Sequence, residues 1–279
     1  MTKIAIIGYG FVGKAMEKGF SKGTNILLID PILNRPIGDL AAFNPEFIFL
    51  CLPTPMLSGG SQDNSILIEV LNELKEVKND ALIILKSTVT PSSLIELEKI
   101  CDRLVYNPEF LREKNYLEDF KNSTFIILGG NKADNKKVMN LYENHSLCKS
   151  KNFLEMDLKS ASLIKYSINS FLASKVIFFN QIKDVFDSTN VEIDWEHFID
   201  CISNDTRIGN SHMMVPGPDG KNGFGGACFP KDLSAFINYA EKIGVDLSLL
   251  KNVKNINNAI RKDYDADHRE IEQNITYDN

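Results

Sequence analysis

A cysteine at the end of a glycine-rich segment has the clearest potential for chemistry in this chain. The segment Gly223–Asp232 reads Gly-Phe-Gly-Gly-Ala-Cys-Phe-Pro-Lys-Asp. Pro230 suits the start of a helix, because its missing N–H would be unpaired there in any case. Cys228 would then lie just before a helix N-terminus, whose partial positive charge favours thiolate over thiol. Asp232 would lie one turn inside the helix, so a nucleophile and a base would be neighbours.

The same segment also fits a simpler interpretation, in which Cys228 is a buried, inert thiol after a helix-capping turn. In the catalytic interpretation, by contrast, glycines such as Gly225 would let the backbone and a substrate approach the sulfur closely. The segment by itself leaves both interpretations open, so the elements that must position it become important.

A second glycine-rich segment, Gly8–Gly13, lies between the apolar run Lys3–Ile7 and the helical pattern Lys14–Phe20. A strand before and a helix after give the pattern G-x-G-x-x-G its meaning as a dinucleotide site. Gly8 would permit the tight turn, Gly10 the approach of a pyrophosphate and Gly13 close packing of helix on strand. The helix N-terminus at Phe11 and Val12 would supply the anion site.

The residue that follows the second predicted strand indicates which dinucleotide binds. Ile26–Ile29 is apolar and is followed by Asp30, about 20 residues after the glycines, where a carboxylate meets the ribose 2′-hydroxyl. Asp30 would repel a 2′-phosphate, so the sequence predicts NAD. Arg35 is expected near the adenine ribose.

Further strand-like and helix-like runs alternate through the first half of the chain. This alternation predicts an α/β fold with a doubly wound, mostly parallel Rossmann sheet. The predicted strands are Phe47–Leu52, Leu82–Leu85, Leu104–Tyr106 and Phe125–Leu128, and the predicted helices between them include Ile66–Val77 and Pro91–Ile100.

Two predicted strands end in residues that could serve a ligand, because ligands bind at the carboxyl ends of parallel strands. Pro53 and Thr54 belong to a proline-stiffened turn where nicotinamide and ribose could rest. The segment Lys86–Pro91 presents hydroxyls before a helix, from Ser87, Thr88 and Thr90, and these fit a helix cap equally well.

The second half of the chain has a helical pattern. Asp157–Phe186 has apolar residues at helical spacing with neither Gly nor Pro, and we expect it to link two domains and pack against a partner. Lys165 and Asn169 would lie on one face of it, either as functional groups or as a solvated stripe. Glu109 and Glu113 would also share a face if residues 107–113 form a helical turn.

We therefore predict a Rossmann domain at residues 1–156 and an all-helical central domain at residues 157–262. A polar tail, residues 263–279, should fray.

Composition excludes several classes of protein. A net charge of −6 argues against a nucleic-acid binder. The apolar start Ile4–Ile7 is too short for a signal peptide or a membrane span. Five scattered cysteines suggest free thiols in a reducing, cytoplasmic compartment, and the four histidines lack the spacing of metal ligands.

Taken together, these segments resemble the UDP-glucose/GDP-mannose dehydrogenase family, most closely its UDP-glucose 6-dehydrogenase branch. The matching motifs run in family order: Gly8–Gly13, Pro53-Thr54-Pro55, Ser87-Thr88-Val89, Asn107–Glu113, Leu163-Ile164-Lys165-Tyr166 with Asn169 and Phe171-Leu172-Ala173, Asp205–Gly209, and Gly223–Asp232. The resemblance implies a helical domain like that of 6-phosphogluconate dehydrogenase.

The resemblance also implies a reaction, in which the C6 alcohol of a nucleotide sugar, UDP-glucose above all, is oxidised to a uronic acid. Two hydrides pass to NAD, and the second leaves a thiohemiacetal on Cys228 to give a thioester that water hydrolyses. Lys165 and Asn169 would stabilise the oxyanion, and Asp232 would act as base or position the water.

The remaining roles are also carried over from the family. Thr88 and Glu113 would surround the same water, with Glu109 as a neighbouring support. Residues 110–112 (Phe110, Leu111 and Arg112) would line the sugar pocket together with Gly225. Arg207 would contact the substrate.

Family members continue into a second Rossmann-like domain that binds the uridine diphosphate, and this chain carries no recognisable counterpart. We therefore expect weak nucleotide binding and a homodimer through the long helix, in which Arg261 of a second copy could help to close the site. Two alternatives stay open: a single-hydride hydroxyacid dehydrogenase, which has no use for Cys228, and a non-catalytic nucleotide-binding subunit.

Overall fold

The computed structural model describes residues 1–77 and 79–277. The chain divides into two compact units. The first unit consists of residues 1–54 and 63–165, and the second of residues 55–62 and 166–279. The long helix α7 (Leu158–Ser188) contributes residues to both.

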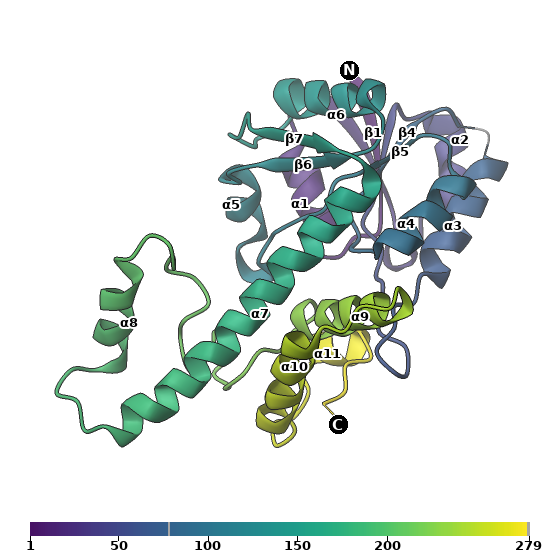
Figure 1. The fold of residues 1–279 in the computed structure, drawn as a ribbon. Coiled ribbons are helices and arrows are strands. Elements are labelled where there is room, and N and C mark those ends of the chain that lie inside the picture. Colours follow the sequence, from purple (N-terminus) through teal and green to yellow (C-terminus); the bar gives the residue numbers. More distant parts are fainter. Residues whose placement is uncertain (78, 278–279) are drawn as a thin grey trace. The chain divides into compact units, whose positions relative to one another are not determined.

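The first unit is built on a twisted sheet with helices on both faces (Figure 1). Within the described residues, seven strands form one sheet in the order β2-β1-β3-β4-β5-β6-β7. The strands are β1 (Thr2–Ile7), β2 (Thr24–Ile29), β3 (Phe47–Leu50), β4 (Leu82–Leu85), β5 (Leu104–Tyr106), β6 (Ile126–Gly129) and β7 (Phe153–Met156). The α helices between them are α1 (Phe11–Gly19), α2 (Leu40–Phe43), α3 (Ser65–Glu76), α4 (Pro91–Ile100), α5 (Tyr116–Lys121) and α6 (Lys132–His145).

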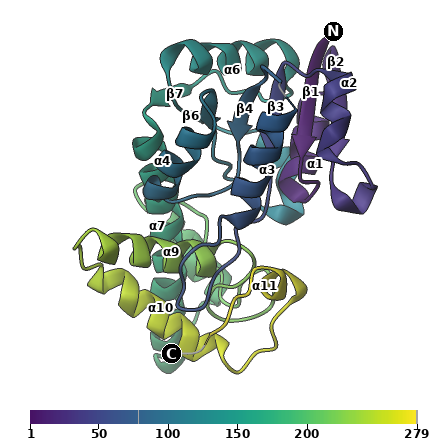
Figure 2. The same cartoon turned by 90° about the vertical axis from the view of Figure 1, so that its right-hand side faces the viewer.

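Alternation along each strand divides the core of this unit into two layers. Ala5 and Ile7 pack with α3, α4 and the start of α7, whereas Ile4 and Ile6 pack with α1, α5 and α6. Figure 2 shows α3 and α4 together on one side of the strands. Strands buried on both faces are typical of a parallel α/β sheet.

The predicted fold class is confirmed, although one pairing in the sheet is antiparallel. β6 runs antiparallel to β5, and the pair is short, joining Tyr106 to Gly129. β7 then pairs parallel to β6. The prediction did not include β7, whose four residues are at least partly exposed and therefore lack the apolar run that marked the other strands.

The second unit is helical. Its helices are the main part of α7, α8 (Trp195–Ser203), α9 (Phe229–Lys242), α10 (Ser248–Arg261) and α11 (His268–Glu272). One core joins α7, α9 and α10 through side chains such as Ile177, Leu233 and Val253. A second core places Trp195 and Ile199 of α8 against Phe179 of α7.

A short excursion from the first half of the chain also belongs to the second unit. Residues 55–62 form a turn closed by the bridge between Met56 and Gln62. The Met56 N–H donates to the Gln273 carbonyl at 2.9 Å, and the Asn238 amide donates to the Gly59 carbonyl at 3.0 Å.

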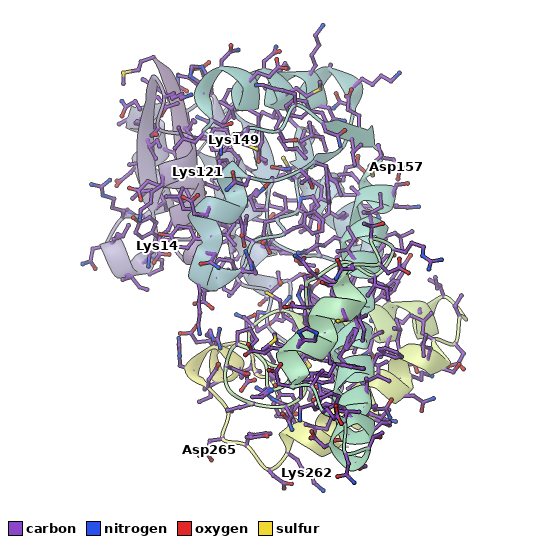
Figure 3. All side chains as sticks on the ribbon, turned by 90° about the vertical axis from the view of Figure 1, so that its left-hand side faces the viewer. Lys14, Lys121, Lys149, Asp157, Lys262 and Asp265 are labelled. Atoms are coloured by element: carbon purple, nitrogen blue, oxygen red, sulfur yellow. The ribbon has the colours of Figure 1, made fainter. Side chains whose placement is uncertain are left out.

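The expectation that the residues after Arg261 fray is wrong for the described part of the tail. Asp267 and Glu270 form a reciprocal capping box that begins α11, and the Glu270 side chain is fully buried. Ile275 is buried as well. Figure 3 labels Lys262 and Asp265, two exposed residues of the turn that leads into this helix. A polar composition therefore concealed buried ionic contacts.

A buried lysine lies at the carboxyl end of β4, the middle strand of the sheet in the first unit. Lys86 follows β4, is 3% exposed, and donates to Asn107 Oδ1 at 2.8 Å. Tyr142 donates to the same oxygen at 2.6 Å, and Asn107 Nδ2 donates to the Ile127 carbonyl at 2.8 Å. Lys86, Asn107 and Tyr142 line a pocket of about 30 Å³ together with Glu109. The volume is enough for a water molecule.

Burial lowers the pKa of Lys86 from 10.5 to about 8, because the charged form loses hydration. In the unfolded chain the ammonium keeps its ordinary pKa. Between these two values the unfolded chain binds more protons than the native protein, so this group makes the native protein more stable as pH rises. Below about pH 8 Lys86 is charged in both states, and its burial lowers the free energy of unfolding by a constant amount.

We predict that a Lys86→Met variant removes this pH dependence. Between pH 7 and pH 10, the free energy of unfolding of the wild type should rise by about 2 kcal/mol relative to the variant. Denaturant unfolding at several pH values measures this difference. Lys99→Met, at an exposed position of α4, is the control and should follow the wild type. A constant gap between wild type and Lys86→Met would contradict the prediction.

Candidate active site

The glycine turn between β1 and α1 has the geometry of a dinucleotide site. Gly8 has φ +93°, and a Cβ there would lie 2.4 Å from the Cys51 carbonyl oxygen. A Cβ on Gly13 would lie 2.1 Å from the Gly8 oxygen, whereas one on Gly10 would meet open space. Glycine is thus required for packing at two positions, and the third leaves room for a ligand to approach.

The first turn of α1 completes this site. Gly10 is the N-cap, so the helix begins at Phe11, Val12 and Gly13. Backbone N–H groups in a first helical turn have no carbonyl partner within the helix. They can hold a pyrophosphate, so the residues present fit NAD.

Asp30 lies directly after β2, as predicted, and its carboxylate fixes the adjoining turn. Oδ2 accepts from the Tyr9 N–H at 2.7 Å, and Oδ1 accepts from the Ile32 N–H at 2.9 Å. Arg35 is exposed and forms a backbone bridge with Asp30. The acidic residue and the glycine turn are therefore held together before any cofactor binds.

The turns after β3 and β4 are joined by hydroxyl groups. Ser87 Oγ donates to the Leu52 carbonyl at 2.7 Å, and Thr54 Oγ1 donates to the Thr88 carbonyl at 3.1 Å. The exposed Pro53 lies between Leu52 and Thr54. Thr90, not Ser87 or Thr88, caps α4. The interpretation of this segment's hydroxyls as a helix cap is therefore confirmed for Thr90, whereas Ser87 and Thr88 do not cap the helix.

The segment after β5 does not form the helical turn considered from the sequence. Residues 107–112 are irregular, and the short 3₁₀ turn begins only at Glu113. The Asn107 amide bonds to the neighbouring strand, and the Glu109 carboxylate accepts from the Leu111 N–H at 2.6 Å. Such side-chain contacts to the backbone compete with a helix. Glu109 and Glu113 therefore share no helical face.

Lys165 is 2% exposed and lies against this irregular segment. Its ammonium donates to the Glu109 carbonyl, lies 3.5 Å from Glu109 Oε1 and sits 4.7 Å above the ring of Phe110. Leu111 is partly buried against the core layer of α1, α5 and α6, and Arg112 turns outward to pair with Asp119 at 2.7 Å. The alternative of a solvated Lys165 is wrong.

The second unit brings the predicted nucleophile and base together. Cys228 is the N-cap of α9, and its carbonyl accepts from the Asp232 N–H at 2.8 Å, one turn on. Asp232 is 1% exposed; its Oδ2 accepts from Asn169 at 2.7 Å and its Oδ1 from Lys231 at 2.5 Å. Asn169 is buried too, so it is no part of a solvated stripe.

Arg207 lies elsewhere on the second unit. Its side chain is 88% exposed and pairs with Asp205 at 2.5 Å. Gly225 lies in the turn before Cys228, where any Cβ would meet buried side chains. In the first unit Lys165 thus contacts Glu109 and Phe110, in the second Asn169 contacts Asp232, and Arg207 is exposed.

Sequence reasoning missed several buried charged residues. Lys86 follows four buried residues of β4, and this position after an apolar strand was the available signal. Lys231 stands inside a segment already selected for Cys228. Arg261 was expected to be offered to a second copy, but it is 1% exposed and bonds within its own unit, so that expectation is wrong.

Neither a cluster of metal ligands nor a membrane-spanning helix occurs in residues 1–77 and 79–277. There, His, Cys, Asp and Glu side chains form no group of three that could hold a metal ion. In the same part of the chain, every helix is too short or too polar to cross a bilayer. The five cysteines all lie there, and none forms a disulfide.

Two family models match this chain. Residues 36–146 match the NAD binding domain of the UDP-glucose/GDP-mannose dehydrogenase family, and residues 159–259 match its central domain. The expected cofactor, NAD, is therefore confirmed by the family of this domain.

Curated relatives give the same result. UDP-glucose 6-dehydrogenase of Rickettsia felis is 33% identical over 217 residues, which cover 75% of this chain and 47% of the relative. The enzyme of that name in Bacillus subtilis is 30% identical over 223 residues, 76% of this chain and 48% of the relative. The chain thus spans about half the length of these relatives.

Solved structures support the fold. A UDP-glucose dehydrogenase from Pyrobaculum islandicum superposes with a TM-score of 0.75 and 24% identity, over 93% of this chain and 68% of that one. The 3-hydroxyisobutyrate dehydrogenase of Mycobacterium tuberculosis gives 0.69 at 16% identity, over 91% of each chain. These low identities speak for the fold alone.

Proposed function

Because the chain belongs to the UDP-glucose/GDP-mannose dehydrogenase family, we propose that it oxidises the C6 alcohol of a nucleotide sugar to a carboxylate with NAD. UDP-glucose is the first candidate, since curated relatives bear the name UDP-glucose 6-dehydrogenase. The observation that carries the proposal is Cys228 at the N-terminus of α9, one turn before a buried Asp232. A single-hydride alcohol dehydrogenase has no need of that thiol.

The proposed reaction runs in three stages. NAD, when bound, accepts one hydride from C6 in each of two oxidations. After the first, the Cys228 thiolate adds to the aldehyde carbon, and the oxygen takes a proton. Loss of that proton and of the second hydride leaves a thioester, which water cleaves to a carboxylate and the free thiol.

Buried polar groups supply the proton transfers and the oxyanion contacts in this scheme. We assign Lys165 and Asn169 to the oxygen on C6, where a fixed donor stabilises charge that develops in the transition state. Asp232 would take the proton, and Asn169 and Lys231 would hold its carboxylate in position. Thr88 and Glu113 are proposed to position the water.

The remaining assignments concern the residues that bind NAD, the residues that bind the sugar, and the two domains. We propose that Gly8–Gly13, Asp30 and Arg35 hold the adenosine and pyrophosphate, and that residues 53–54 and 87–88 contact the nicotinamide side of NAD. The sugar would meet Glu109, residues 110–112, Gly225 and Arg207. Residues 1–156 would form the NAD domain and residues 157–262 the central domain.

Self-association through α7 is part of the proposal. Phe171, Phe178 and Val185 recur at seven-residue intervals on this helix, and they are 65%, 55% and 62% exposed. Side chains at that spacing share one helical face, and a second copy of the same helix would cover it.

We also propose a reducing, cytoplasmic setting for the protein, with which its free thiols are consistent.

We predict that Phe178→Glu shifts the protein to a monomer, because a charge on the shared face opposes burial. Sedimentation velocity should show a dimer for the wild type and half that mass for the variant. Asp187→Lys, which alters a charge on the opposite side of α7, nine residues after Phe178, is the control and should remain dimeric. A monomeric wild type would contradict this part of the proposal.

The yield of NADH tests the function directly. With limiting UDP-glucose, we expect two NADH per sugar and a uronic acid detected by mass spectrometry. A single-hydride dehydrogenase would give one, and a non-catalytic subunit none.

Cys228→Ala should abolish the acid product while NAD binding, measured by calorimetry, stays unchanged. Acid formation by Cys228→Ala at the normal rate would exclude the thioester.

Lys165→Ala should lower kcat by about 10²–10³, because a donor aimed at the developing oxyanion acts chiefly in the transition state. Lys159→Ala, at an exposed position on the same helix, is the control and should leave kcat unchanged. Initial rates over a range of sugar concentrations give kcat and KM separately. A rise in KM alone would show that Lys165 anchors the substrate instead.

A further inference from the structure

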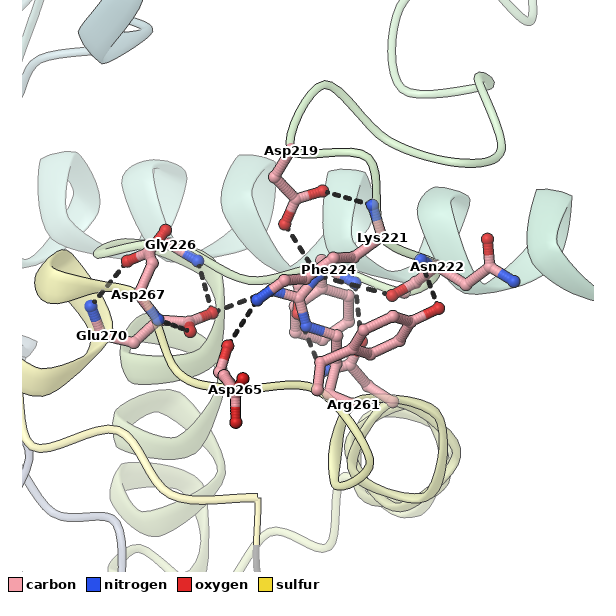
Figure 4. Close-up of polar contacts among 12 residues, drawn as sticks. Asp219, Lys221, Asn222, Phe224, Gly226, Arg261, Asp265, Asp267 and Glu270 are labelled. Atoms are coloured by element: carbon pink, nitrogen blue, oxygen red, sulfur yellow. Dashed lines mark hydrogen bonds and ion pairs between the residues drawn. The ribbon is translucent and has the colours of Figure 1, made fainter.

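The largest fully buried side chain in the described part of the chain is Arg261, the last residue of α10. Its guanidinium donates to Asp219 Oδ2 at 2.8 Å, to Glu270 Oε1 at 2.9 Å and to the Asn222 carbonyl at 3.4 Å (Figure 4). The rings of Tyr264 and Tyr277 each lie 5.7 Å from it. This chain therefore uses a charged residue as the centre of a small core.

Glu270 is the partner that links this core to the glycine-rich turn before Cys228. Its Oε1 accepts from the Gly226 N–H at 3.0 Å and from the Tyr277 hydroxyl at 2.6 Å, as well as from Arg261. Its Oε2 accepts from the Asp267 N–H at 2.8 Å. Burial raises the pKa of Glu270, but these hydrogen bonds and the Arg261 charge outweigh it and hold the pKa below its usual value. The carboxylate is therefore ionised at neutral pH.

The glycine turn is shaped to fit this ion pair. A Cβ on Gly225 would lie 1.9 Å from the Arg261 guanidinium and 2.3 Å from Glu270 Oε1. Gly226 has φ +74°, and the guanidinium of Arg269, which pairs with Asp267, lies 3.8 Å from where its Cβ would be. The turn can contact the pair this closely only because it carries no side chains.

Other buried groups hold the start of the same turn. Asn180 Oδ1 accepts from the Gly223 N–H at 2.9 Å, and Asn257 exchanges two hydrogen bonds with the backbone of Phe224, at 2.7 and 3.0 Å. Glu270 then holds Gly226, two residues before Cys228. A buried ion pair is poor evidence of stability, because desolvation offsets the attraction between the charges. Its place at the end of this series of contacts suggests a positioning role.

We propose that Glu270 is a positioning residue for Cys228. By fixing the Gly226 N–H, it sets the conformation of the turn that places the thiol at the N-terminus of α9. The tail that carries Glu270 thereby forms part of the active site without touching the substrate. This inference deepens the proposed function and rests on Cys228 being its nucleophile.

The pH profile of Cys228 alkylation tests the positioning role. In Glu270→Gln, a released turn should move the thiol away from the helix N-terminus, so the profile should shift to higher pH. At neutral pH, alkylation should slow about two- to fivefold, the range expected for losing a helix-terminus interaction. The purely electrostatic effect of removing a carboxylate beside Arg261 has the opposite sign, because it would favour the thiolate.

Iodoacetamide labelling with peptide mass spectrometry reads each cysteine separately. Exposed Cys201 should react equally in all variants, and buried Cys148 reports general unfolding. Glu272→Gln, at an exposed position of the same helix, is the matched control and should match the wild type. Tyr277→Phe removes one donor to Glu270 and should shift the Cys228 profile in the same direction by less. It also keeps the test available if Glu270→Gln fails to fold.

An unchanged profile, or a shift to lower pH in the variants that fold, would overturn the proposal. Faster labelling of Cys148 together with Cys228 would also overturn it, because the effect would then be global destabilisation. The assay needs neither NAD nor a sugar, so its outcome is independent of the NADH yield. A shifted profile without NADH production would refute the proposed function alone.

Discussion

The first unit depends on the register of its parallel strands. Ile7 pairs with both Ile29 and Leu50, Leu50 pairs with Leu85, and Leu85 pairs with Tyr106. The residues that follow these strands therefore leave the sheet at one edge. They include Gly8, Asp30, Lys86 and Asn107. A slip of one residue would turn each strand side chain into the other core layer and displace the residue after the strand, so the two layers and the edge proposed to bind NAD depend on the same register.

The strand ends also explain how much of this site the sequence could predict. Leu82–Leu85 is a short apolar run in a chain that alternates strand-like and helix-like patterns, and the observed β4 has those bounds. Glycine positions carry information of the same kind, because Gly8 and Gly13 have no room for a Cβ. The proximity of Cys228 and Asp232 was predictable because a helix brings residues four apart together.

Contacts between segments far apart in sequence were not predictable in this way. Asn107 lies in an irregular segment because its amide bonds to a neighbouring strand, and no local pattern announces that bond. The tail looked solvated because its composition is polar, yet Glu270 is buried by Arg261, nine residues before it, and by Gly226. The charged residues of a buried ion pair cannot be told from exposed charged residues by composition alone.

The division of the chain has a consequence for its genetic dissection. The chain passes between the two units at residues 54/55, 62/63 and 165/166, so neither unit is one continuous stretch of sequence. A gene fragment that begins at Tyr166 would omit residues 55–62 and leave the Gln273 carbonyl without its Met56 donor. Recombination between relatives at the middle of α7 would separate the same pair. Each unit has its own core, but no single cut in the chain separates one unit from the other.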